Sequence, residues 1–221
     1  MGQASELYMS QASPVVLKKK PLSISRREKR QLELRRRILD ATVQLVQEQD
    51  INSIAVEHIC TEADVARKTF YNYFANKQEV VFALCDELLF QRSEKLLETA
   101  LANPDLSLDT FLRGYLLQVG DNLTEYSAVD RQLIAQVMGE ALSSERVQKH
   151  LVVLRAGFSE MVRRGQASGE VRKNFGADFY AMVILSSMNG LISGWANNSE
   201  FPVSEQLTEL GDFLLQSICV S

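Results

Sequence analysis

Apolar residues recur at intervals of three and four along most of the chain, the spacing that places side chains on one face of an α-helix. Alternating runs of β-branched residues, which are typical of half-buried strands, are absent from the sequence. We therefore expect an all-α protein of about nine helices, with an N-terminal three-helix helix-turn-helix domain and a C-terminal helical domain.

Polar, proline and capping residues divide this pattern into separate helices. The first helix is expected at about 25–49, and two short helices joined by a tight turn at about 55–74. A long helix should span about 77–100 and stop before Asn103 and Pro104, because the residue before a proline disfavours the helical conformation. Later helices are expected to begin at about Ser107, Val129, Ser143 or Ser144, Ala177 and Ser204.

Three regions follow from these elements. Residues 1–31 are expected to form a basic arm without regular structure and the start of the first helix. Residues 32–92 are expected to form a helical domain around the helix-turn-helix at 55–74. Residues 93–221 are expected to form a second helical domain.

Charge is distributed unevenly along the chain. The net charge is −4, but residues 1–80 hold 13 basic and 10 acidic residues, and residues 81–221 hold 11 basic and 18 acidic residues. Within 18–37 there are 10 basic and 2 acidic residues. A basic N-terminal region in an otherwise acidic chain favours a local nucleic-acid-binding surface. The arm at 18–30 is either part of that surface or a solvated tail.

The two short helices have distinct faces. The first packs through Val56, Ile59, Cys60 and Ala63, and the second through Phe70 and Phe74. The opposite face of the second helix carries cations, hydroxyls and an amide, which suit phosphates and base edges in the major groove. Its residues are Arg67, Lys68, Thr69, Tyr71, Asn72 and Tyr73.

This segment resembles the DNA-binding signature of the TetR family of transcriptional regulators, which has a shape such as I-A-x-x-A-G-V-S-x-x-T-x-Y-x-x-F-x-x-K. The chain reads ICTEADVARKTFYNYFANK over 59–77. The close resemblance covers about 32–92, and beyond it only the number and length of helices match.

The resemblance implies a role for each polar position. Phosphate contacts fall on Thr69, Tyr71, Tyr73 and Lys77. Base readers are expected at Arg67, Lys68 and Asn72. The alternative is that the tyrosines pack in a small core and the other residues form a solvated face.

Three positions depart from the family pattern. Asp64 stands where the family has a turn glycine, and aspartate tolerates a left-handed backbone better than most residues. Ala55 and Ala66 replace residues that usually cap the two helices. We expect Asp64 to cap the recognition helix and Ser53 to cap the helix before it.

The resemblance implies a homodimeric repressor that binds double-stranded DNA at a pseudo-palindromic operator and is released by a small apolar effector. It assigns DNA binding to residues 32–92, and effector binding and dimerisation to residues 93–221. The dimer would form through the last two helices, at about 177–196 and 204–220. Large side chains of the second domain would form its core and partly line an effector cavity: Phe111, Tyr115, Tyr126, Met138, Phe158, Met161 and Trp195. An activator is the alternative sign of regulation, and the operator and effector are left open.

The competing class is an all-helical dimeric interaction module whose basic arm binds an acidic protein or membrane. An enzyme is disfavoured, because no catalytic constellation or glycine-rich phosphate loop is visible. His58 and His150 lack metal-ligand spacing, so no metal or cofactor is expected.

A cytoplasmic location is expected from the three cysteines and the absence of a visible signal peptide. Cys60, Cys85 and Cys219 lack paired spacing, so no disulfide framework is implied. Residues 179–196 lack charge, but a buried core helix fits this segment better than a membrane span.

Overall fold

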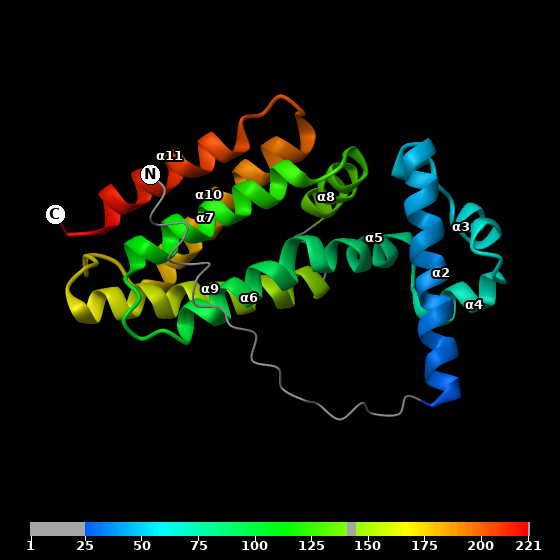
Figure 1. The fold of residues 1–221 in the computed structure, drawn as a ribbon, viewed down its shortest axis with the longest axis horizontal. Helices are drawn as coiled ribbons and strands as arrows, with labels where there is room; N and C mark the ends of the chain where they lie inside the picture. The colour runs from blue at the N-terminus through cyan, green and yellow to red at the C-terminus, as the bar shows by residue number, and fades with distance from the viewer. Residues whose placement is uncertain (1–24, 141–144, 221) are drawn as a thin grey trace.

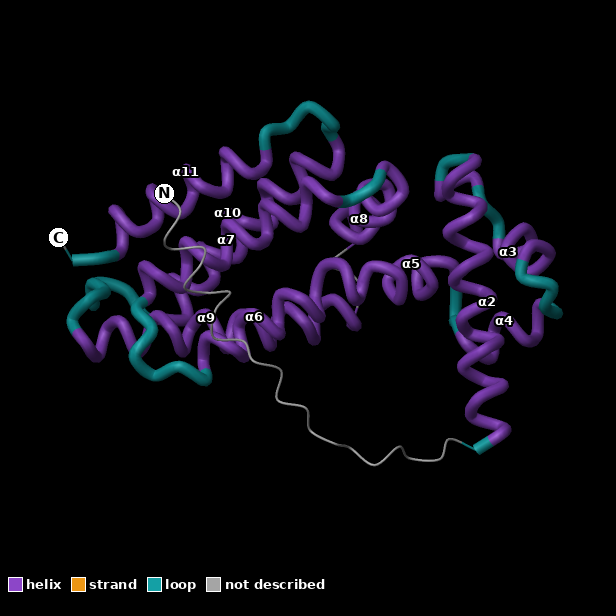
Figure 2. The backbone as a smooth tube through the Cα atoms, viewed as in Figure 1, coloured by secondary structure: helices purple, strands orange, loops and turns teal. Residues whose placement is uncertain are grey.

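A computed structural model of the chain describes residues 25–140 and 145–220, and it is helical almost throughout (Figure 1). The elements are α2 (Arg26–Glu48), a 3₁₀ turn (Ile51–Ser53), α3 (Val56–Glu62), α4 (Arg67–Tyr73), α5 (Lys77–Cys85), a π-helical turn (Asp86–Gln91), α6 (Arg92–Leu101), α7 (Leu108–Glu125), α8 (Ala128–Glu140), α9 (Glu145–Ser168), α10 (Ala177–Asn197) and α11 (Val203–Ile218). Because α5, the π-helical turn and α6 are continuous, these residues hold nine α-helical stretches. The all-α prediction is confirmed, and short loops join the helices (Figure 2).

The first helix begins and ends where the sequence predicts. Ser25 and Glu28 form a reciprocal capping box, in which the Ser25 hydroxyl accepts from the Glu28 N–H and the Glu28 carboxylate accepts from the Ser25 N–H. The Ser25 backbone and hydroxyl lower the pKa of Glu28. The helix buries Ile38, Ala41 and Val46, and α3 packs against it.

The C-terminal helices form a bundle in which α11 packs along α7, and α10 packs against α8, α9 and α11. Its core is apolar and aromatic, with Phe111, Phe158 and Trp195 each almost fully buried. Phe111, Tyr115 and Phe158 pack as tilted and edge-to-face pairs at ring-centroid distances of 5.0–5.5 Å. Aromatic side chains of this size each bury a large apolar area in a core.

The long helix at 77–100 departs from its expected form. It contains the π-helical turn, whose extra residue shifts the buried face, so that Phe90 is buried while Leu88 and Leu89 are only partly buried. The widened turn leaves the Leu88 carbonyl available, and it accepts a hydrogen bond from the Tyr126 hydroxyl at 2.7 Å. Phe90 stacks on the His150 ring of α9 at 4.5 Å.

The structure bears on two further expectations, the charge-poor helix α10 and the basic segment at 18–30. By length and hydropathy, α10 is the one helix among the described residues that could cross a membrane. It instead buries one face in the bundle, including Ala181, Ile184 and Trp195. In the basic segment at 18–30, residues 18–24 lie outside the described residues, and Arg26 to Arg30 are exposed on the first turns of α2.

Candidate nucleic-acid interface

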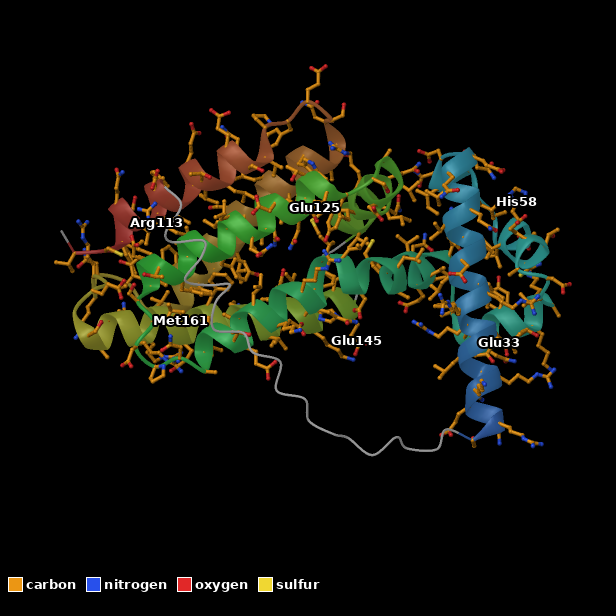
Figure 3. All side chains as sticks on the ribbon, in the orientation of Figure 1. Glu33, His58, Arg113, Glu125, Glu145 and Met161 are labelled. Carbon is orange, nitrogen blue, oxygen red and sulfur yellow. The ribbon has the colours of Figure 1, made fainter. Side chains whose placement is uncertain are left out.

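The helices α3 and α4 lie on the side of α2 that faces away from the C-terminal bundle (Figure 1). Figure 3 shows Glu33 on α2 and His58 on α3 at this end of the molecule, with Arg113 and Met161 at the other. The outer surface of α4 is therefore open to a large partner such as a DNA duplex.

The turn between α3 and α4 is anchored to α2. Asp64 has a φ of 48°, the left-handed conformation that the sequence predicts for it. The Arg37 guanidinium donates to the Ala63 carbonyl at 2.6 Å, the Asp64 carbonyl at 3.0 Å and the Asp64 carboxylate at 3.1 Å. Arg37 therefore links the first helix to the turn that sets the angle between α3 and α4.

The predicted helix caps at this turn are wrong. Ala66 is the N-cap of α4 and Ala55 that of α3, and neither Asp64 nor Ser53 caps a helix. Asp64 pairs with Arg37 instead, and the His58 ring nitrogen accepts from the Ala55 N–H at 3.4 Å. Neither α3 nor α4 therefore has a side-chain cap from its N-cap residue.

The two faces of α4 differ as the periodicity predicts. Phe70 and Phe74 are buried, with their ring centroids 6.0 Å apart. Arg67, Lys68 and Asn72 are exposed on the opposite side. This arrangement holds the helix by its apolar face and leaves two cations and an amide facing outwards.

Arg67 has two neighbours: Tyr71, four residues later on the same helix as helical periodicity predicts, and Glu57 of α3, which periodicity does not predict. Its guanidinium lies 2.9 Å from the Glu57 carboxylate and 5.7 Å from the centre of the Tyr71 ring. The Tyr71 hydroxyl and the Glu57 charge raise the pKa of Arg67, which stays protonated. Arg67 and Glu57 lie ten residues apart on two different helices, so the sequence holds no periodic signal for this pair.

The hydroxyl residues of α4 lie at different depths. Tyr71 is exposed, whereas Thr69 and Tyr73 are partly buried, and Tyr73 packs against the core. Phosphate contact by Tyr73 would use its polar end while the ring stays packed.

The Lys77 ammonium points into the protein. It donates to the carbonyls of Ile51 at 2.7 Å, Ile54 at 2.8 Å and Asn52 at 3.3 Å. These carbonyls belong to the 3₁₀ turn and the residue after it, which connect α2 to α3. Lys77 thus has a structural role that the motif alone does not indicate, and its phosphate contact stays a prediction.

Basic residues of α2 extend the positive surface beside α4. Arg36 is exposed next to Asp40, and Arg35 lies 5.3 Å from the centre of the Phe74 ring. With Arg26, Arg27 and the other cations of the first turns, they add to the charge of the recognition helix.

A separate cavity lies within the bundle and has a volume of about 40 Å³. Leu88, Leu89 and Phe90 of the π-helical turn form one wall, and the remaining lining comes from α6 to α10 and from Tyr126, which follows α7. The π-helical turn therefore lies between this cavity and α5, which packs against α2.

Comparison with known proteins agrees with this geometry. Residues 38–84 match the family model described as bacterial regulatory proteins, tetR family. The fatty acid metabolism regulator protein of Bacillus subtilis (strain 168) is 24% identical over 170 residues, which cover 74% of this chain and 84% of the relative.

Solved structures share the fold. Native NalD, the secondary repressor of the MexAB-OprM multidrug efflux pump in Pseudomonas aeruginosa, matches with a TM-score of 0.68 and 18% identity over 86% of this chain and 98% of its own. Thermus thermophilus FadR in complex with lauroyl-CoA matches with a TM-score of 0.64 and 20% identity over 85% of this chain and 96% of its own.

Proposed function

We propose that this chain, whose N-terminal helices belong to the tetR family of bacterial regulatory proteins, is a cytoplasmic homodimeric repressor released from its operator by a small effector. The observation that carries the proposal is the outer face of α4, where Arg67, Lys68 and Asn72 are exposed on a helix held by Phe70 and Phe74.

Each polar side chain of α4 has a proposed task. Arg67 and Lys68 suit guanine, and Asn72 suits adenine, because these side chains match the donor and acceptor pattern of those bases in the major groove. The salt bridge to Glu57 holds Arg67 until DNA competes for it.

Phosphate contacts are assigned to Tyr71, Thr69, Tyr73 and Lys77. Tyr71 is the best placed of the four, since it is exposed beside Arg67. Contacts of this kind position the protein on the duplex without reading its sequence.

Dimerisation is assigned to α10 and α11, the last two helices. Both leave large apolar side chains exposed, including Phe179 and Met182 on α10 and Phe213 on α11, which is 65% exposed. Exposed apolar side chains mark a protein interaction site where they form a contiguous patch. A dimer would place two copies of α4 in successive major grooves about 34–36 Å apart.

Effector release is assigned to the cavity of the bundle. A ligand that binds one arrangement of the cavity walls better than another shifts the equilibrium between them. The π-helical turn would carry this change to α5 and the DNA-binding helices. The relative FadR was crystallised with lauroyl-CoA, so an acyl chain is one candidate occupant.

Selection of bound DNA from a random pool by the purified chain tests this function. A palindrome recovered at physiological salt, and not recovered by an Arg67→Ala/Asn72→Ala variant, is the expected result. An Arg155→Ala variant, altered on α9 in the C-terminal bundle, is the matched control and should recover the same palindrome. No enrichment over random sequence would overturn the proposal in favour of a helical interaction module.

A further inference from the structure

Glu57 links the two helices of the helix-turn-helix on their exposed side. It lies in the first turn of α3, and its Oε1 atom is 2.9 Å from the Nη1 atom of Arg67, the first residue of α4. The Arg67 side chain is still 64% exposed. The carboxylate therefore contacts the proposed base-reading guanidinium without covering it.

The contact engages only one end of the guanidinium. This group is planar and carries five N–H donors in a fixed fork, so a carboxylate at Nη1 leaves the edge formed by Nε and Nη2 for a second partner. Guanine presents two acceptors in the major groove, O6 and N7, which an arginine binds with two N–H groups. Guanine can therefore bind the free edge of Arg67 without displacing Glu57.

Tyr71 restricts Arg67 from a second direction. Its ring centre lies 5.7 Å from the guanidinium carbon, within the range of a cation–π contact. An arginine without such neighbours samples many rotamers, and a phosphate oxygen accepts a hydrogen bond from several of them. A phosphate or base that approaches Nη1 has to break the salt bridge to Glu57, whereas guanine at the free edge does not.

We propose that Glu57 is a specificity-determining residue, which positions Arg67 so that its free edge reads guanine and withholds Arg67 from phosphates and other bases. The inference rests on the proposed DNA-binding function and adds to it an acidic residue that acts through Arg67. A carboxylate beside the duplex weakens the attraction to DNA of every sequence. What Glu57 improves is the discrimination between sequences, which is a difference of affinities.

Simple repulsion is the competing explanation. An exposed salt bridge contributes little by itself, and Glu57 would then only lower the affinity for all DNA sequences through its negative charge. Glu62 provides a matched control, because it is an exposed glutamate at the end of the same helix. Glu57→Gln and Glu62→Gln remove the same charge from α3, so a difference in base preference between the two variants reports positioning.

Selection from a random DNA pool, followed by competition binding, tests the inference on the purified full-length chain. Arg67→Ala identifies the operator position at which Arg67 reads guanine, because this variant should lose the preference there. Glu57→Gln should reduce the guanine preference at that position about two- to fivefold, the range that an exposed ion pair supplies. Its affinity for random DNA should stay the same or rise, and Glu62→Gln should keep the wild-type preference.

The symmetry of the operator enlarges the effect. A dimer places one Arg67 in each half-site, so replacing the guanine in both half-sites doubles the difference in free energy. The preference lost in Glu57→Gln should then reach about four- to twenty-five-fold, the square of the effect in one half-site. Competition binding resolves a change of this size.

A double-mutant cycle separates positioning from a structural role. In the Arg67→Ala background, Glu57→Gln should leave the base preference unchanged, because the residue that Glu57 positions is absent. The inference is overturned if Arg67→Ala loses no guanine preference, or if Glu57→Gln keeps the wild-type preference. It is also overturned if Glu57→Gln lowers binding to all sequences by one factor together with the melting temperature, or if its effect on base preference persists without Arg67.

The same measurements distinguish failure of this inference from failure of the proposed function. If the wild-type chain selects a palindrome and Glu57→Gln selects it with the same guanine preference, the role of Glu57 fails and the DNA-binding function stands. If the wild-type chain enriches no sequence, the DNA-binding function fails, and the role of Glu57 fails with it.

Discussion

Replacing Lys77 by methionine tests whether this residue stabilises the fold. Methionine keeps an unbranched apolar stem and removes the ammonium that donates to the carbonyls of Ile51, Asn52 and Ile54. Ile51 and Ile54 are themselves buried, so their carbonyls have poor access to replacement water.

The expected destabilisation can be worked from these hydrogen bonds. A hydrogen bond to a charged group contributes about 1.5–3 kcal/mol, and partial exposure of the donor reduces this value. Counting only the two short bonds, at 2.7 and 2.8 Å, at the low end gives a destabilisation of about 2–3 kcal/mol. For a protein of this size, that corresponds to a melting temperature about 4–12 °C lower.

Calorimetry of Lys77→Met and of the control Lys68→Met, altered on the exposed face of α4, measures the difference. The control should change stability by less than about 0.5 kcal/mol. A Lys77→Met protein that melts within about 1 °C of the wild type refutes the structural role. The salt dependence of operator binding then measures any phosphate interaction of Lys77, since removing one cation that neutralises a phosphate lowers the slope by about 0.9.

Three further changes probe the turn, the dimer and the thiols. Asp64→Gly should alter the stability of the protein by less than about 1 kcal/mol, because glycine relieves the positive φ while the exposed ion pair to Arg37 is lost. Asp64→Val should destabilise the protein by about 2 kcal/mol in a thermal melt, because valine does not tolerate this backbone conformation. Phe213→Asp should convert the dimer to monomers, as measured by sedimentation. The control Val152→Asp changes an equally exposed residue on α9 and should leave the dimer intact. A Phe213→Asp protein that is still dimeric would exclude α11 from the interface. Cys219 should react with Ellman's reagent before Cys85, because Cys85 is fully buried and only the thiolate form of a cysteine attacks the reagent. Burial strongly raises the pKa of Cys85, so little of its thiolate forms. Peptide mass mapping that finds the reverse order of reaction would refute this burial argument.

The helical fold and the two faces of the recognition helix follow from the sequence alone. Apolar residues at intervals of three and four put Ile59, Phe70 and Phe74 on the buried faces of their helices. The same spacing leaves Arg67 and Asn72 on the exposed face, independently of the rest of the chain. These features are local, because one turn of helix fixes the direction of each side chain. The left-handed turn at Asp64 could also be predicted, since few residue types accept that backbone.

The partners of the charged and polar groups, by contrast, depend on how the helices pack. Lys77 reaches carbonyls 23–26 residues earlier, and Arg37 reaches a turn 26–27 residues later. Likewise, the π-helical turn and the His150 ring between Asp86 and Glu94 depend on how α6 and α9 meet. A long polar side chain pairs with the groups that tertiary packing places near it. Helical periodicity carries no information about the distance between side chains on different helices.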